Sequence, residues 1–360
     1  MLTILIFIIV LGVLVFVHEF GHFITAKKAG MKVEEFGFGF PPRIWGVKKG
    51  ETVYSINWIP FGGFVKILGE AGEEAGNPRS FASKPAGAKA KVIVAGVIMN
   101  FLLAALLLSF GNWSGLRVGI LDDETARVAT DKKIQIIGIS PDSPASGAGI
   151  SPLDEIYGFM INGQEIKAES VEQVQDVIKE NAGSELTFLI RNGTEIVPKN
   201  ITPRENPPEG QGATGIALAQ TGIVKYPWYQ APIKGVENAV VLTINTAIGY
   251  GTIIKNLFVT GNAGVELTGP IGIAVITGQA TRLGFTYLMQ FTALISINLA
   301  VLNIIPFPAL DGGRLLFIII EKIKRSPIPR KVENIVNTAG FALLIFLMIY
   351  VTIKDIFKFL

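Results

Sequence analysis

The sequence predicts a polytopic α-helical membrane protein with four transmembrane helices, a re-entrant β-hairpin region on the cytoplasmic side and one extracytoplasmic α+β domain. Three observations lead to this prediction. The 360 residues are 49% hydrophobic and only 17% charged, with a mean hydropathy of +0.47, which is typical of membrane proteins. Four apolar runs of about 20 residues are each long enough to cross a hydrocarbon core of roughly 30 Å. Basic residues gather in two of the connecting segments.

The four apolar runs are residues 2–17, 92–113, 285–305 and 335–353. The first has no basic residue ahead of it and no small-residue cleavage site, so we expect a membrane anchor rather than a secretory signal. We also expect its helix to continue through the following sequence, HEFGHFITA.

The basic residues predict the orientation of these helices. Residues 25–91 carry eleven Lys and Arg against six acids, and residues 306–333 carry six against three. Because basic loops remain in the cytoplasm, we expect both segments there and both termini outside. The net charge of +3 is too small to indicate a nucleic-acid partner.

The segments between the helices show three patterns. Residues 31–90 contain short alternating apolar runs with Gly and Pro, which predict β-hairpins. This region either dips back into the membrane under a protein cover or forms a small cytosolic sheet. Residues 116–206 alternate like strands around one helical stretch, and residues 207–284 hold a long amphipathic helix pattern expected on the outer membrane surface.

The predicted boundaries are 1–30 for the first transmembrane helix, 31–90 for the hairpin region and cytoplasmic loop, 91–113 for the second transmembrane helix, 116–206 for the outer domain, 207–284 for the amphipathic helical membrane-surface region, 285–325 for the third transmembrane helix with its cytoplasmic segment, and 334–354 for the fourth.

The chemistry begins with histidine usage. The chain has no cysteine and two histidines, His18 and His22, so a transition-metal site must use imidazole and carboxylate ligands. The spacing H-E-x-x-H places both imidazoles on one helix face, one turn apart, and puts Glu19 on the same turn as a candidate general base. Ionisable residues this close to hydrocarbon indicate function.

A catalytic zinc ion usually takes three protein ligands, so the third ligand must be a carboxylate. The best candidate is Asp311, in NIIPFPALDGG, which follows the third apolar run on the cytoplasmic side. Pro306 and Pro308 end the helix there. Two alternatives remain open from the residues alone: Asp311 as a helix N-cap, and Asn303 as an interhelical hydrogen-bonding residue.

Together these motifs resemble the site-2 protease family of intramembrane zinc metalloproteases, in particular the bacterial regulator-of-sigma-E protease branch. The resemblance covers nearly the whole chain and rests on HEFGH, FGFGFPPR, IPFGGFVKILGE, GPIGIA and NIIPFPALDGG. It implies one Zn²⁺ per chain, held by His18, His22 and Asp311, with Glu19 as general base. It also implies a multi-pass protein of the bacterial inner (plasma) membrane whose active site lies near the cytoplasmic side.

The resemblance further implies a substrate-binding role for Asn303 and a secondary role near the site for Asn100. The hairpin, with Gly62, Gly63 and Phe64, would pair with an unwound substrate strand. Substrates would be single-span membrane proteins, such as an anti-sigma factor or a remnant signal peptide, already cut by another protease. Position 314 is Arg where many members have His, and we do not expect this difference to abolish zinc binding.

The outer region resembles a PDZ domain of the bacterial membrane-protease type, through SPDSPASGAGI and INGQEI. It departs from that pattern at Ser151-Pro152-Leu153, where a glycine is more usual. A PDZ domain would exclude substrates with bulky outer domains, and the alternative is a purely structural β-domain.

Three alternatives fit these residues less well than an intramembrane protease. A catalytically inactive PDZ-bearing membrane scaffold has no need of Glu19. A metal transporter would carry acidic residues along several helices, and these helices are nearly free of acids beyond Glu19. An ordinary secreted metalloprotease would lack the second, membrane-paired aspartate motif.

Overall fold

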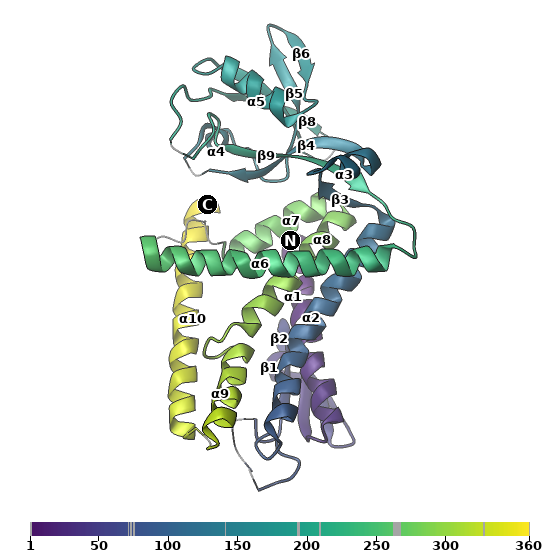
Figure 1. Ribbon diagram of the computed structural model, residues 1–360, viewed down its shortest axis with the longest axis vertical. Helices are drawn as coiled ribbons and strands as arrows, with labels where there is room; N and C mark the ends of the chain where they lie inside the picture. Colours follow the sequence, from purple (N-terminus) through teal and green to yellow (C-terminus); the bar gives the residue numbers. More distant parts are fainter. Residues whose placement is uncertain are drawn as a thin grey trace. The chain divides into compact units, whose positions relative to one another are not determined.

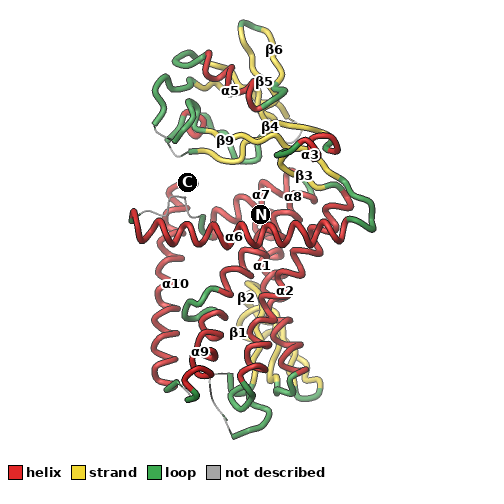
Figure 2. Tube along the Cα trace, viewed as in Figure 1, coloured by secondary structure: helices red, strands yellow, loops and turns green. Residues whose placement is uncertain are grey.

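The computed structural model describes residues 2–70, 72, 74, 76–140, 142–192, 195–208, 210–261, 268–326 and 328–359 (Figures 1 and 2). The predicted regions 31–90, 116–206 and 207–284 each contain residues outside this description, and only their described parts are compared. Contacts divide the chain into two compact units. We call Met1–Phe110, Pro232–Ala280 and Leu288–Leu360 the membrane unit, and Gly111–Ala231 with Thr281–Tyr287 the sheet unit.

Four helices of the described chain are long and apolar enough to cross a membrane, as the sequence predicted. They are α1 (Leu2–Lys28), α2 (Ala86–Ser114), α8 (Phe285–Ile304) and α10 (Arg330–Phe359). In their most apolar stretches, 44% of α2 and 39% of α8 is buried, against 17% of α1 and 11% of α10. Helices α2 and α8 therefore form the interior, while α1 and α10 leave apolar faces for lipid.

Helix α1 ends in a turn that directs the chain into a sheet. Gly30 has a φ of +67°, Gly30 N donates to Lys27 O, and Met31 N donates to Ala26 O. This pattern is a Schellman motif, in which a left-handed glycine satisfies the last carbonyl groups of a helix.

The sheet of the membrane unit consists of β1 (Val33–Lys49) and β2 (Thr52–Ile67). Residues 35–38 register with residues 53–56 and also with residues 63–66, so β2 folds back along β1. Aromatic rings attach this sheet to α1: the Phe36 ring lies 4.7 Å from that of Phe23 and 5.2 Å from that of Phe16. Gly62, with a φ of +104°, lies where a Cβ atom would be 2.7 Å from Val15 Cγ1 of α1. These strands lie within the region for which the sequence predicted β-hairpins.

The sheet unit has a seven-stranded sheet with the order β3-β9-β4-β5-β7-β8, and β6 pairs with β5. Its elements are β3 (Leu116–Gly119), α3 (Asp123–Val128), β4 (Thr130–Ile139), α4 (Pro144–Gly147), β5 (Glu155–Ile161), β6 (Gln164–Lys167), α5 (Val171–Glu180), β7 (Leu186–Asn192), β8 (Glu195–Ile201) and β9 (Ile216–Val224). Its core is centred on Phe159 and Phe188, whose rings pack edge to face at 4.9 Å. Val174 and Ile178 of α5 cover this core.

The sheet unit extends further along the chain than the boundaries predicted for the outer domain. Strand β9 lies between β3 and β4, so residues 216–224 belong to the sheet rather than to an amphipathic helical region. The predicted boundary at residue 206 is therefore wrong. The Pro- and Gly-rich stretch before β9 separates it from β8, and sequence periodicity does not reveal which strand it joins.

Three more helices complete the membrane unit: α6 (Ala231–Thr260), α7 (Pro270–Leu283) and α9 (Asp311–Lys324). Helix α6 runs crosswise to α2 and α10 (Figure 1). The start of α7 is capped from α10, where the Asp355 carboxylate accepts hydrogen bonds from Gly269 N and Gly272 N at 3.2 and 2.8 Å. This cap joins the C-terminal helix to the GPIGIA sequence.

Replacing Phe188 with Ala should lower the free energy of unfolding of the sheet unit by about 3–5 kcal/mol, because it opens a cavity in a well-packed core. The urea dependence of proteolysis within residues 111–231 of the intact protein measures this change. Leu121→Ala, at a position 91% exposed in the same unit, is the matched control. An equal, small effect of both substitutions would contradict this account of the core.

Candidate metal centre

The two histidines lie on one face of α1, and both are 7% exposed. Their rings meet edge to face with centroids 4.7 Å apart, and their Nε2 atoms are separated by 3.1 Å. The helical spacing of i and i+4 produces this arrangement. The H-E-x-x-H sequence thus places two nitrogen atoms at one point.

Helix α2 orients both imidazoles from the opposite side. His22 Nδ1 lies 2.8 Å from Val92 O, a distance at which Nδ1–H donates and Nε2 remains available as a ligand. His18 Nδ1 lies 3.4 Å from the side-chain amide of Asn100, which is fully buried. With the amide oxygen turned toward His18, this group accepts from Nδ1–H in the same way, because the oxygen and nitrogen of an amide are assigned from their partners. Such partners fix the tautomer of metal-binding histidines.

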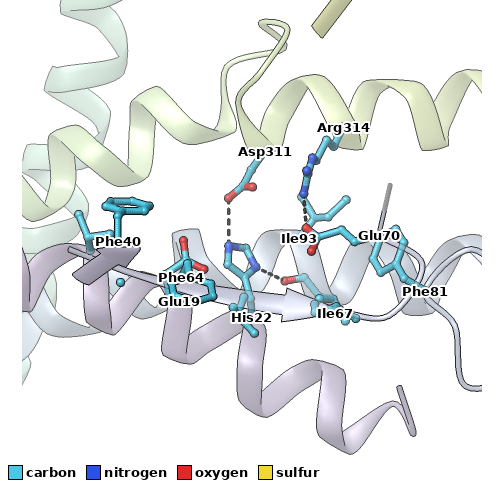
Figure 3. A pocket seen from close by; sticks show the side chains of 14 residues that line it. Glu19, His22, Phe40, Phe64, Ile67, Glu70, Phe81, Ile93, Asp311 and Arg314 are labelled. Carbon is cyan, nitrogen blue, oxygen red and sulfur yellow. Dashed lines mark hydrogen bonds and ion pairs between the residues drawn. The ribbon is translucent and has the colours of Figure 1, made fainter. Parts of the chain in front are cut away.

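Asp311 reaches the histidines from the segment between α8 and α9. Helix α8 ends at Ile304, before Pro306 and Pro308. A Cβ atom on Gly312 would collide with the carbonyl groups of Ile304 and Ile305, so glycine allows α9 to begin against the end of α8. Asp311 Oδ2 lies 3.0 Å from His18 Nε2 and 3.3 Å from His22 Nε2. Figure 3 marks the contact with His22.

The capping alternative for Asp311 does not describe this geometry. Asp311 is the first residue of α9, the N-cap position belongs to Leu310, and no side chain caps the helix. The Asp311 carboxylate is instead directed at the two imidazoles.

Helix α10 holds the segment that precedes Asp311. Ala309 has a φ of +72°, a conformation that residues other than glycine rarely adopt. Its N–H donates to Asn337 Oδ1 of α10 at 3.2 Å. The Asn337 side chain therefore stabilises an unfavourable backbone conformation two residues before the carboxylate.

The three ligand atoms fit a zinc ion. Bonds of about 2.0–2.1 Å in a tetrahedral arrangement place ligand atoms roughly 3.3 Å apart, and the three separations here are 3.0, 3.1 and 3.3 Å. Within the described chain, Asp311 Oδ2 is buried without a hydrogen-bond donor. When both imidazoles carry their proton on Nδ1, three acceptors face one another. A cation satisfies all three.

The general-base candidate and the predicted substrate-binding residues line two cavities beside this cluster. One, of about 300 Å³, is lined by Glu19, Gly63, Phe64 and Asp311, and Figure 3 shows Glu19 and Phe64 on its wall. We call it the catalytic cavity. The other, of about 240 Å³, is lined by Asn100, Asn303, Glu19 and Asp311. Gly62 packs on Val15 next to Gly63. The structure thus brings the predicted site residues together.

Sequence reasoning missed the residue that makes room for the histidines. A Cβ atom on Gly96 of α2 would lie 2.5 Å from His22 Nε2 and 2.7 Å from His18 Cε1. Gly96 stands four residues before Asn100 on the same helix face, and this spacing was its one available signal. The Val92 carbonyl and Asn337 were missed as well, because backbone atoms and distant helices have no local motif.

Comparison with known proteins assigns the chain to a family. A family model described as peptidase family M50 matches residues 6–347. The chain belongs to peptidase family M50. The expected resemblance to site-2 proteases and the expected class of enzyme are thereby confirmed, and with four apolar helices the chain is a multi-pass membrane protein.

Relatives that align over nearly their whole length bear matching names. The zinc metalloprotease RasP of Oceanobacillus iheyensis is 33% identical, with 99% of each chain covered. The zinc metalloprotease RasP of Geobacillus kaustophilus is 30% identical over 99% of this chain and 98% of its own. The regulator of sigma-W protease RasP of Bacillus subtilis is 30% identical, with 98% of each chain covered.

Replacing Gly96 with Ala should weaken metal retention by at least about tenfold, because the added methyl group displaces both imidazoles from their partners on α2. Metal content per chain, measured by mass spectrometry after dialysis, reports this loss. The matched control is Gly87→Ala on the same helix, where nothing lies within 4 Å of the added carbon. Full metal content in Gly96→Ala would contradict the packing described here.

Proposed function

We propose that the protein is a zinc-dependent intramembrane protease that hydrolyses peptide bonds in or near transmembrane segments of single-span membrane proteins. The observation that carries this proposal is the convergence of His18, His22 and Asp311 beside the Glu19 carboxylate, on a helix of membrane-spanning composition. Zinc is the cofactor, in agreement with the names of the relatives, and these three residues would hold it.

The residues around the metal have separate roles. Zinc, when bound, supplies a Lewis acid that polarises water and the substrate carbonyl group. Glu19 takes the proton from the attacking water and delivers it to the leaving amine. Asn303, which lines the cavity of about 240 Å³ together with Asp311, holds the substrate backbone, and Asn100 of the same cavity orients His18.

The location of the site follows from the length of α1. Sixteen residues, 2–17, precede His18 and span about 24 Å at 1.5 Å per residue. With both termini on the outer face, as the basic loops predict, this length supports a site inside the bilayer near its cytoplasmic side. Proteolysis there releases a cytoplasmic fragment.

The β1–β2 sheet presents the substrate as an unwound strand. Residues 63–66 pair with residues 35–38, and Gly63, Phe64 and Val65 line the catalytic cavity. A peptide strand added along this segment gains main-chain hydrogen bonds. Unwinding is required because a helical peptide bond is shielded by its own turn.

Exposed apolar side chains support a re-entrant position for this sheet over a cytosolic one. Trp45 and Trp58 are 58% and 68% exposed, and Ile44, Ile56 and Ile59 are exposed with them. Large apolar patches rarely face water in soluble proteins, whereas lipid accommodates them.

The sheet unit serves as an outer, PDZ-like filter that excludes substrates with bulky outer domains. A cavity of about 410 Å³ lies between α5 and the segment leading into β9, lined by Ile178, Arg204, Gly212 and Ile216. Its dimensions suit the end of a polypeptide rather than a folded domain. Substrates would therefore be cut by another protease first, as with anti-sigma factors or remnant signal peptides.

A membrane scaffold without activity is the second candidate, and Glu19 argues against it. Burying a carboxylate beside metal ligands is costly, and a scaffold gains nothing from it. The name of the Bacillus subtilis relative, regulator of sigma-W protease, also favours a regulatory protease.

Replacing Glu19 with Gln should leave one zinc per chain and abolish cleavage, since the amide cannot take a proton. Cleavage of a model single-span substrate by purified protein in detergent tests this, with wild type and variant compared with and without a chelator. Wild-type turnover that stops with chelator and returns with zinc supports the proposal. Turnover by Glu19→Gln near the wild-type rate would remove Glu19 as the base.

Replacing Asp311 with Asn should weaken zinc retention by at least about tenfold, because a neutral amide oxygen attracts Zn²⁺ less strongly than an anionic carboxylate oxygen does. Zinc per chain after dialysis is the measurement, and Glu19→Gln, which keeps all three ligands, is the control. Unchanged stoichiometry in Asp311→Asn would show that Asp311 is not a ligand.

A further inference from the structure

A larger cavity adjoins the catalytic cavity in the membrane unit. It is distinct from the cavity of about 240 Å³ that Asn100 and Asn303 line. It measures about 630 Å³, against about 300 Å³ for the catalytic cavity. The two share four lining residues: Glu70, Phe81, Ile93 and Arg314. All four are labelled in Figure 3, where Glu70 and Arg314 face each other across the end of the catalytic cavity. We call the larger space the second cavity.

An ion pair separates the two cavities. Arg314 Nη1 donates to Glu70 Oε1. Glu70 lies three residues beyond the end of β2 at Ile67, and Arg314 lies one helical turn after Asp311 on α9. The pair therefore connects the end of the substrate-facing strand to the helix that carries a metal ligand.

This pair opens at little cost. The side chains of Arg314 and Glu70 are 44% and 26% exposed, and a single nitrogen–oxygen contact joins them. Accessible single-contact pairs of this kind shift an equilibrium by no more than about fivefold. The pair thus contributes little to the stability of the fold. Its two side chains can separate and so connect the two cavities.

The strand that faces the catalytic cavity leads into the second cavity. Gly63, Val65 and Ile67 line the first, Glu70 lines both, and Gly69 and Gly72 line the second. A peptide extended along this segment, at about 3.3 Å per residue, passes the Glu70–Arg314 pair and enters the larger space. This continuity identifies the occupant as the substrate chain itself.

The walls of the second cavity suit a polypeptide better than a simple ion. Apart from the ion pair, the walls carry two basic residues, Lys89 and Arg330, and two acidic residues, Glu321 and Glu333. Because the charges balance, the cavity favours neither an anion nor a cation. Phe317 and Ile318 supply apolar surface beside them. Main-chain amides carry donors and acceptors together and match such mixed walls.

We propose that the second cavity is a substrate subsite, which binds the segment of the substrate chain beyond the scissile bond and is entered when the Glu70–Arg314 pair parts. The inference rests on the proposed protease function. It assigns to Glu70 and Arg314 a positioning role at the entrance and to the second cavity a part in specificity.

Filling the second cavity tests the subsite. Ala82, on its wall, is replaced by Trp in the full chain, and the neighbouring exposed residue is replaced in the control, Ser83→Trp. The rate of cleavage by each protein is measured on a single-span substrate and on a series of peptides shortened stepwise from either end. We expect wild type and control to lose at least about tenfold in kcat/KM when the outlying residues are removed from one end. Ala82→Trp should cleave long and short substrates at the same low rate, with zinc content unchanged.

A cross-link tests the role of the Glu70–Arg314 pair. The chain has no cysteine, so Glu70→Cys with Arg314→Cys provides two unique thiols for a bis-maleimide. The bridged protein should retain zinc and should prefer the long substrate over the shortest active peptide less strongly than the unbridged double variant does. Equal effects of filling or bridging on long and short substrates, or no effect on either, would overturn the inference. Absence of cleavage by wild type would instead contradict the protease function itself.

Discussion

Three buried acceptor atoms that meet at one point form the constraint on which the rest of the membrane unit depends. His18 Nε2, His22 Nε2 and Asp311 Oδ2 lie within 3.0–3.3 Å of one another. Without a cation this arrangement places unpaired lone pairs together in a low-dielectric environment, which is strongly unfavourable. With a cation the same atoms hold α1 and α9 together. A bound metal therefore stabilises the packing of α1 against α9 in addition to its chemical role.

Each of the surrounding elements supports that point in a different way. Helix α2 supplies a carbonyl group at Val92, an amide at Asn100 and empty space at Gly96. Helix α10 holds Ala309 through Asn337. Ser296 of α8 donates to Asn100 O at 2.7 Å, which links the third membrane helix to the second behind the histidines. Three helices thus orient three ligand atoms, and small shifts in any of them change the metal geometry.

The sequence predicted what depends on local spacing. Two histidines four residues apart must share a helix face, and prolines around position 307 must end α8. Asp311 was the best carboxylate candidate from the residues alone, and the resemblance to site-2 proteases implied that it joins His18 and His22. Contacts between distant segments were not predictable in this way. Gly96 differs from the other glycines of α2 through what lies opposite it, and β9 joins its sheet across a stretch without periodicity. The partner of Arg314, on a loop 244 residues away, has no signal in a single sequence.

X-ray absorption at the zinc edge of the purified protein tests the central claim most directly, because it reads the ligands without requiring a substrate. The account predicts one zinc per chain with two imidazole nitrogens and a carboxylate oxygen at about 2.0–2.2 Å. It also predicts that the imidazole scattering disappears in a protein with both histidines replaced. A shell of oxygen atoms alone, with no imidazole scattering in the wild type, would contradict the metal centre described here.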